Sequence, residues 1–190
     1  ACATSAMREA ENRHDICESI LHNTGIDLEV ISGKEEAKLI FSNFHLSSND
    51  LEKNYIFIDV GGGSTELSLI QNNVKTSSKS FNIGSVRYLS GNEAEKVKIQ
   101  MKSWLNDNYS KNEEISAIGT GGSINKLYNL SKHNFDQPMT YKSLNEIIKY
   151  ISSFSYEDRI RVLKLKPDRA DVIVPSGEIY KMVMSSTGAN

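Results

Sequence analysis

Apolar and polar positions recur along this chain with two different periods, which predicts both helices and strands. From Ser5 to about Asn23, apolar residues recur at roughly helical spacing, so a helix is expected there although residues 12–15 interrupt the stripe. A short strand is expected over Leu28–Ile31. Ser32 and Glu35 then have the spacing of a capping box that begins a second helix. The apolar face of that helix consists of Ala37, Ile40, Phe41 and Phe44.

A second unit, with three strands, is predicted after residues 45–54, which are polar, lack a period and therefore form a loop. Tyr55–Val60 is almost continuously apolar, as expected of a strand that is covered on both faces. Residues 66–71 alternate between apolar and polar positions, as a strand with one buried face does. Because Asn tolerates a positive φ, Asn72-Asn73 predicts a hairpin turn before a third strand, Val74–Phe81.

The rest of the chain is predicted to be mainly helical, with one further strand. The expected elements are, in order, a helix over about Glu93–Asn108, a strand over Ile115–Ile118, a helix beginning near Ile124, a helix with a capping box at Ser143 and Glu146, helix across 156–164, and an extended or helix-entry segment at Val172–Pro175. From Tyr55 onward the order strand, strand, strand, helix, strand, helix matches the ribonuclease H-like unit of the actin-like ATPase superfold, an α/β fold with a mixed sheet and flanking helices. We therefore expect residues 1–50 to be the C-terminal part of a first lobe, and residues 51–190 to be a second ribonuclease H-like lobe that is truncated at its C-terminus.

Composition favours a folded chain in which any anion binding is local. With 190 residues, of which 38% are hydrophobic, the chain can bury a core. Lys and Arg number 22 against 24 for Asp and Glu, so no global positive field exists to hold nucleic acid. No apolar run approaches the roughly 20 residues needed to cross a bilayer. Cys2 and Cys17 are too few for a disulfide scaffold and are expected to be free thiols in the cytoplasm.

The strongest candidate for chemistry is the segment from Asp59 to Glu66, Asp-Val-Gly-Gly-Gly-Ser-Thr-Glu. A carboxylate at the end of a buried strand is costly to desolvate unless a donor or a cation compensates it, and a bound metal would do so. Gly61, Gly62 and Gly63 leave backbone N–H groups accessible to phosphate oxygens. Phosphate binding is favoured over a plain hairpin turn, because a turn alone does not require three glycines. The missing Gly-Lys-Ser/Thr ending excludes a P-loop, and the strand that follows excludes a dinucleotide fingerprint.

Three further candidates are weaker. Gly121 and Gly122 belong to the cluster 119–123 between a strand and a helix, where a helix N-terminus would attract phosphate, although close packing of strand on helix explains the glycines equally well. Glu36 has no capping role and is a candidate general base for activating water, but on sequence alone a surface charge is the favoured interpretation. Arg8 suits bidentate contact with phosphate, whereas an exposed helix Arg is the commoner case.

With these residues identified, the chain resembles the exopolyphosphatase and guanosine pentaphosphate phosphatase family. The matching stretches follow the family order and are Ala3–Arg13, Ile31–Phe41, Ile58–Leu67, Gly119–Ser123 and Arg169–Pro175. The first three are specific, and together the five span nearly the whole chain.

The resemblance implies a hydrolase that releases terminal phosphate from inorganic polyphosphate or from guanosine pentaphosphate. It implies that Glu36 activates the attacking water and that Arg8 approaches the phosphate from the facing lobe. Asp59 and Glu66 would hold a divalent cation, expected to be Mg²⁺, and Gly61–Ser64 would cradle the terminal phosphate. Neither nucleic acid nor a membrane is expected as a partner, and a homodimer is compatible with the resemblance.

Two departures from the family pattern limit what this chain is expected to do. Family members carry an Asp-x-Gly-Ser-Asn-Ser-like phosphate loop upstream of anything present here, so the chain alone is expected to be inactive or feeble. Lys164 stands where relatives often have glycine. The alternatives are a catalytically silent nucleotide or polyphosphate sensor, which would tolerate loss of Glu36 or Asp59, and a sugar or acid kinase of the same superfold, which would need an adenosine pocket.

Overall fold

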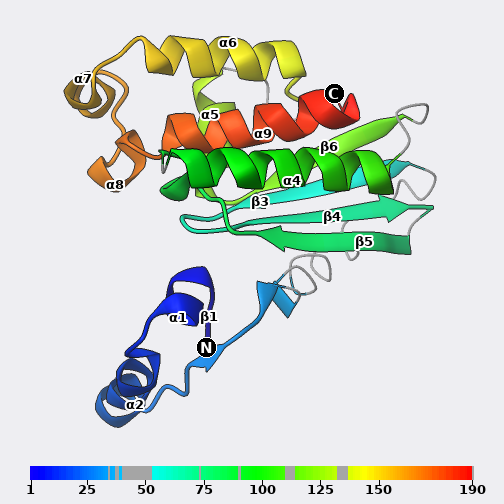
Figure 1. Ribbon diagram of the computed structural model, residues 1–190. Coiled ribbons are helices and arrows are strands. Elements are labelled where there is room, and N and C mark those ends of the chain that lie inside the picture. The colour runs from blue at the N-terminus through cyan, green and yellow to red at the C-terminus, as the bar shows by residue number, and fades with distance from the viewer. Residues whose placement is uncertain are drawn as a thin grey trace.

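Figure 1 shows a four-stranded sheet with helices gathered on one face and the N-terminal residues on the other side. This computed structural model describes residues 1–33, 35, 36, 39, 53–72, 74–89, 91–109, 114–131 and 137–189. The strands of the sheet are β3 (Asn54–Val60), β4 (Thr65–Gln71), β5 (Val74–Phe81) and β6 (Ile115–Thr120).

The strand order of the sheet is β5-β4-β3-β6. β4 is antiparallel to both β3 and β5, and β6 is parallel to β3. A parallel pair needs a crossover connection, which here contains α4 (Asn92–Asn108). The predicted order of three strands, a helix, a strand and a helix is therefore confirmed, as is the α/β fold class with a mixed sheet and flanking helices.

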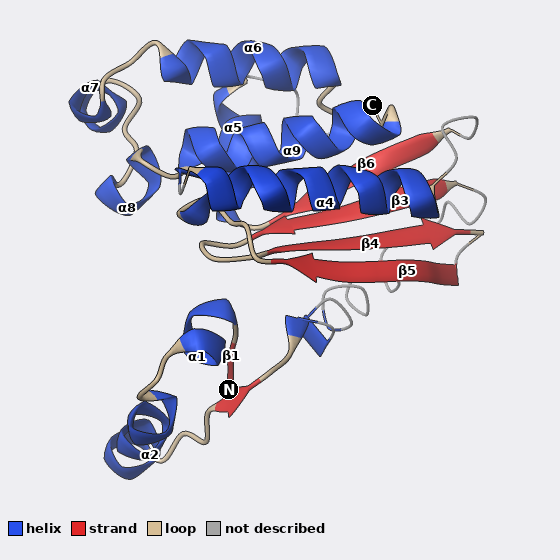
Figure 2. Cartoon of the chain, viewed as in Figure 1, coloured by secondary structure: helices blue, strands red, loops and turns tan. Residues whose placement is uncertain are grey.

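The helical layer consists of α4 together with three further helices, α5 (Gly122–Leu130), α6 (Tyr141–Ser152) and α9 (Ile173–Thr187) (Figure 2). Along β3 and β4 the side chains alternate between the two faces of the sheet. The side chains of β3 and β4 that join the core under the helices are Ile56, Ile58, Val60, Leu67 and Leu69. Asp59 and Glu66, at the alternate positions, therefore lie on the face opposite the helical layer.

Short helices connect the larger elements: η1 (Arg87–Leu89), α7 (Tyr156–Arg161) and α8 (Pro167–Ala170). The predicted helix across 156–164 ends early, at Arg161. Lys164 follows with φ +53°, the left-handed conformation that favours glycine. Within the described ranges, every helix is too short or too polar to cross a membrane.

The N-terminal segment is more broken than the sequence pattern predicts. It contains β1 (Cys2–Ala3), α1 (Ser5–Glu9), α2 (Arg13–Thr24) and β2 (Glu29–Val30), with β1 and β2 paired in parallel. The prediction of one helix from Ser5 to Asn23 is wrong, because Ala10 adopts an extended conformation with ψ 125° and separates α1 from α2. The polar run that interrupts the apolar stripe lies directly after this break.

Several boundaries also differ from the prediction. The N-cap of α6 is Thr140, whose side chain accepts a hydrogen bond from Ser143 N, so the predicted capping box at Ser143 is wrong. β3 begins at Asn54, and α5 begins two residues before Ile124. The hairpin turn predicted from the tolerance of Asn for positive φ is confirmed at Asn72, which has φ +50°, whereas Asn73 lies outside the described residues. The apolar face predicted at 37, 40, 41 and 44 also lies outside them. The division into lobes at residue 50 stays a prediction.

Candidate active site

Strand pairing gathers polar side chains at one end of the sheet. Asp59 on β3 is the register partner of Glu66 on β4 and of Thr120 on β6. Directly opposite residues on neighbouring strands point to the same face. The two carboxyl groups therefore lie side by side, at the point where the chain turns from β3 to β4.

Arg8 and Glu36 reach this point from the N-terminal segment. Arg8 Nη1 donates to Glu36 Oε2 at 3.1 Å and to Ile31 O at 2.8 Å, and Arg8 Nη2 lies 3.8 Å from Glu66 Oε1. The side chains of Arg8 and Glu36 are only 23% and 17% exposed, so the interpretation of both as surface charges is wrong. Oxygen atoms of Glu36, Asp59 and Glu66 all lie within 4.8 Å of one another.

The helical turn that carries Glu36 begins as the sequence predicts. Ser32 N donates to Glu35 Oε2 at 2.8 Å, and Glu35 N donates to Ser32 Oγ at 3.2 Å, which confirms the capping box. Gly33 in this turn is pressed against β5, because a Cβ at Gly33 would lie 2.6 Å from Ser80 Cβ. Only glycine lets the turn approach the sheet closely enough to place Glu36 in the cluster.

Burial raises the pKa of both carboxyls on the sheet. The Glu66 side chain is 3% exposed; desolvation raises its pKa, and the hydroxyls of Ser64 and Ser80 lower it in part. The pKa of Asp59 is raised by desolvation and lowered in part by the Thr120 hydroxyl. That hydroxyl is buried and makes no hydrogen bond of standard geometry to any described residue. Two desolvated carboxyls in contact fit a cation, because a positive charge would offset the cost of ionising them.

The residues Gly61–Ser64 form a hairpin turn, the glycine bend, between β3 and β4. Gly61 N donates to Ser64 O at 2.9 Å, which closes the bend. Within the described part of the chain, the backbone N–H groups of Gly62 and Gly63 donate to no protein acceptor. Free N–H groups beside a cation site suit the oxygens of a phosphate.

Two glycines of the bend differ in how much room surrounds them. A Cβ at Gly63 would lie 2.6 Å from Ser5 Oγ on α1 and 3.5 Å from Ser5 Cβ, so the Ser5 hydroxyl would have to rotate away to admit it. A Cβ at Gly62 would meet only Val86 Cγ2 at 3.7 Å, an ordinary contact. Protein packing therefore explains Gly63 but leaves Gly62 unexplained.

The second glycine cluster adjoins the same site. Gly121 has φ +97°, and a Cβ there would lie 3.3 Å from Asp59 Oδ1. A Cβ at Gly122 would lie 2.7 Å from Arg169 Nη2, and Arg169 Nη1 donates to Ser123 Oγ at 2.8 Å. Arg169 thus lies over the N-terminus of α5. Close packing and an anion contact are both compatible with this arrangement.

Sequence reasoning missed four residues that build the site: Ser5, Gly33, Ser80 and Arg87. Each contributes through a contact between segments that are far apart in the sequence, so no local pattern marks it. Ser5 and Gly33 at least lie inside two of the stretches that carry the family resemblance, Ala3–Arg13 and Ile31–Phe41. Ser80 carries no signal of this kind, since it is one of several serines on β5.

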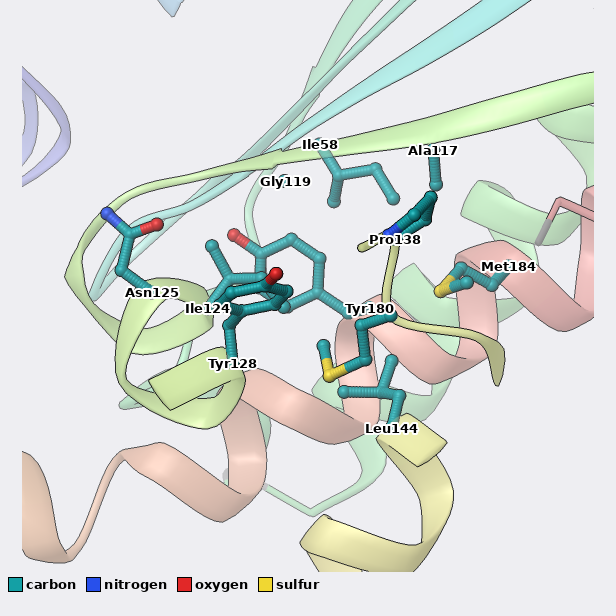
Figure 3. A pocket seen from close by; sticks show the side chains of 11 residues that line it. Ile58, Ala117, Gly119, Ile124, Asn125, Tyr128, Pro138, Leu144, Tyr180 and Met184 are labelled. Atoms are coloured by element: carbon teal, nitrogen blue, oxygen red, sulfur yellow. The ribbon is translucent and has the colours of Figure 1, made fainter. Parts of the chain in front are cut away.

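A separate apolar cavity lies on the helix side of the sheet (Figure 3). It measures about 200 Å³ and is lined by residues that include Tyr128, Leu144, Tyr180 and Met184. Tyr180 Oη donates to Thr120 O at 2.6 Å, and burial raises the pKa of Tyr180. Because none of the described residues that line the cavity is charged, it does not suit phosphate and is not part of the acidic site.

Comparison with known proteins places these features in a family context. The model of the Ppx/GppA phosphatase family matches residues 1–187. The chain is 28% identical over 210 residues to a bifunctional 3-dehydroquinate synthase/phosphatase of Fusobacterium nucleatum, and 24% identical over 204 residues to exopolyphosphatase 1 of Mycobacterium bovis. These alignments cover 98% and 97% of this chain but 31% and 59% of the two relatives. The chain thus spans less than two thirds of their length.

Solved structures share the fold. An exopolyphosphatase from Cytophaga hutchinsonii matches with a TM-score of 0.79 and 21% identity, over 100% of this chain and 68% of that one. The Ppx/GppA family member from Aquifex aeolicus matches with a TM-score of 0.75 and 22% identity, over 100% of this chain and 67% of that one. At such low identity these matches show a common architecture.

Proposed function

The chain belongs to the Ppx/GppA phosphatase family, and on that premise we propose that it is part of a hydrolase that releases terminal phosphate from inorganic polyphosphate. One observation carries the proposal. Carboxylate oxygens of Glu36, Asp59 and Glu66 converge within 4.8 Å of one another, beside a glycine bend with free backbone N–H groups. Hydrolysis of a phosphoanhydride needs an oriented water and compensation of negative charge, and this arrangement offers both.

In the proposed mechanism Glu36 is the general base. Its side chain is 17% exposed, so water reaches it, and Arg8 Nη1 holds its Oε2 at 3.1 Å. Glu36 accepts a proton as the water oxygen attacks the terminal phosphorus, and the bond to the bridging oxygen breaks with its electrons passing to the remaining phosphate chain. Arg8 and the N–H groups of Gly62 and Gly63 contact the oxygens of the terminal phosphate.

Asp59 and Glu66 would hold a divalent cation in this proposal. Mg²⁺ prefers oxygen ligands and binds proteins through one or two carboxylates together with substrate phosphates. When bound, it supplies charge neutralisation to the phosphate oxygens. Ser80 Oγ, which donates to Glu66 Oε1 at 2.8 Å, orients one of the two ligands.

We favour polyphosphate as the substrate because several relatives are named exopolyphosphatases. Guanosine pentaphosphate is the second candidate, since the resemblance described under Sequence analysis implies it as an alternative substrate. A sensor without activity would not need the ion pair between Arg8 and Glu36. A kinase of the same superfold would need a nucleoside pocket that opens onto the acidic cluster.

The test is phosphate release by the full-length protein, measured with polyphosphate and with guanosine pentaphosphate, each with and without Mg²⁺. We expect release from polyphosphate that requires the cation, and a fall of about 10²- to 10⁴-fold for Glu36→Gln. Glu146→Gln, on the exposed face of α6, is the matched control and should retain full activity. Normal turnover by Glu36→Gln would remove Glu36 from the role of base. Phosphate binding without turnover by the unmodified protein would favour the sensor.

A further inference from the structure

Helix α1 makes one contact with the glycine bend and one with η1. Ser5 packs directly on Gly63, where a side chain on the glycine would collide with Ser5 Oγ. Four residues further along the same helix, Glu9 forms an ion pair with Arg87 of η1. In Figure 1, α1 lies on the side of the sheet away from the helical layer, so these contacts join the N-terminal segment to the second unit.

The segment that carries Arg87 is itself fixed to the glycine bend. Ser85 N donates to Gly61 O and Val86 N donates to Gly62 O, both at 2.9 Å. Gly84 packs against the backbone of the bend so closely that a Cβ there would lie 2.5 Å from the carbonyl carbon of Gly62. Arg87 therefore follows a segment that is hydrogen-bonded to the glycine bend. The carbon of its guanidinium lies 3.6 Å from the position that a Cβ on Gly63 would take.

Helix α1 needs such anchoring because it has only five residues. A helix of that length is unstable in isolation and relies on tertiary contacts. Arg8 is the residue next to Glu9, and its guanidinium must reach both Glu36 and Glu66. A small rotation of α1 would carry Arg8 away from the carboxylates.

On the basis of the proposed function, we infer that Arg87 is a positioning residue: by pairing with Glu9 it holds α1 on the glycine bend, so that Arg8 faces the acidic cluster. The side chains of Arg87 and Glu9 are 33% and 44% exposed, and an ion pair this exposed contributes little to the stability of the fold. Its effect on geometry is larger, because a misplacement of about 1 Å in a catalytic group lowers turnover by up to about 10²-fold.

A double-mutant cycle in the full-length protein tests this role. Arg87→Ala and Glu9→Gln should each lower kcat for polyphosphate by about tenfold, with KM within about twofold of the parent, and the double variant should be no worse than either single one. The charge exchange Glu9→Arg with Arg87→Glu should recover part of the loss. Arg161→Ala is the matched control, since Arg161 forms an ion pair with Asp158 at 2.8 Å on α7 and contacts no residue of the site.

The competing outcome is direct substrate binding by Arg87. In that case Arg87→Ala would raise KM, while Glu9→Gln would keep the parent kcat and KM, and the inference would be wrong. Additive losses in the double variant would also contradict it.

Hydrogen exchange tests whether Arg87 holds α1 in place, and it needs no substrate. Amides of Ser5–Glu9 should exchange faster in Arg87→Ala than in the parent, and at the parent rate in Arg161→Ala. Unchanged exchange in Arg87→Ala would overturn the inference even if activity fell. If the parent protein released no phosphate at all, the proposed function would fail, whereas the exchange experiment would still decide whether Arg87 anchors α1.

Discussion

The buried carboxylates of Asp59 and Glu66 require a positive charge nearby to offset the cost of ionising them. Each carboxyl is desolvated, which raises its pKa, and the charges of Glu36 and Asp59 raise the pKa of Glu66 further. Arg8 compensates Glu66 only in part, because its Nη2 lies 3.8 Å from Glu66 Oε1 and its Nη1 is committed to Glu36 and Ile31. The negative charge that remains on the sheet is what a divalent cation would neutralise.

This imbalance predicts a pH-dependent stability in the absence of divalent cations. The pKa values of Asp59 and Glu66 lie above their ordinary values of 3.8 and 4.5, so between the unfolded and the folded pKa the folded state binds more protons. The free energy of unfolding therefore falls as the pH rises through that window. Asp59→Asn removes the cost of ionising this buried carboxyl, so the variant should be more stable than the parent at pH 7.

Urea unfolding in EDTA between pH 4 and pH 7 measures this difference. The exposed Glu11 provides the control, because Glu11→Gln should leave the pH dependence unchanged. If Asp59→Asn lost stability with rising pH as steeply as the parent does, burial of Asp59 would not be the cause.

At the scale of single residues, the sequence predicts the acids of the site but not their supports. Asp59 and Glu66 stand out because charged residues flank an apolar strand and a run of glycines. Ser80 and Gly33 do not, because what matters is their mutual contact across 47 residues of chain. Lys164 was only partly predictable. The family resemblance indicates that relatives often have glycine at this position, and the positive φ of Lys164 is the physical reason for glycine there.

Among the elements, the glycine bend makes the clearest prediction. Gly62 has room for a methyl group and no positive φ, so Gly62→Ala should unfold within about 0.5 kcal/mol of the parent. If the bend cradles phosphate, the same methyl group would stand between the free N–H groups and the substrate, and phosphate release should fall by about tenfold or more. Gly63→Ala is the comparison, because its Cβ would also meet the Ser5 hydroxyl on α1. Full activity in Gly62→Ala would show that substrate does not approach the bend.

The turn that carries Glu36 makes a second prediction at this scale. Gly33→Ala places a Cβ 2.6 Å from Ser80 Cβ and 2.7 Å from Ser80 Oγ, so the turn must move away from β5 and take Glu36 with it. We expect a loss of about 10- to 100-fold in kcat, measured as phosphate release. Adding Ser80→Gly removes both obstructing atoms and should restore part of the activity. No recovery in the double variant would mean that Gly33 acts in another way.

Element order was predictable because it follows from local periodicity, whereas helix breaks were not. The three strands from residue 54 to residue 81 alternate or run apolar as buried strands do, and their order emerged correctly. The break between α1 and α2 lies at Ala10, whose extended conformation has no periodic signal in the sequence. Ser5 of α1 contacts the glycine bend, whereas α2 has no buried residue of its own.

For the molecule as a whole, the site joins two parts of the chain that are far apart in the sequence. Glu36 and Arg8 come from the first 36 residues, and Asp59, Glu66 and the glycine bend come from the sheet. With a net charge of −2, the chain offers a polyanion no general attraction, so binding must depend on this junction. A cation held at the junction would therefore stabilise the whole molecule as well as the substrate.

The coupling between cation binding and folding gives the last prediction. A ligand that binds only the folded state adds about 2.7 kcal/mol at about 100 times its dissociation constant, which corresponds to a rise of roughly 5 to 10 °C in the unfolding midpoint for a chain of this size. Mg²⁺ or Mn²⁺ should produce such a rise near pH 7. The rise should shrink as the pH falls toward the pKa values of Asp59 and Glu66, because protons then compete with the cation for the same oxygens. Scanning calorimetry with Glu66→Gln as the site variant and Glu146→Gln as the control distinguishes specific binding from a general salt effect, since only Glu66→Gln should lose the rise. An equal rise in both variants would place the cation elsewhere on the molecule.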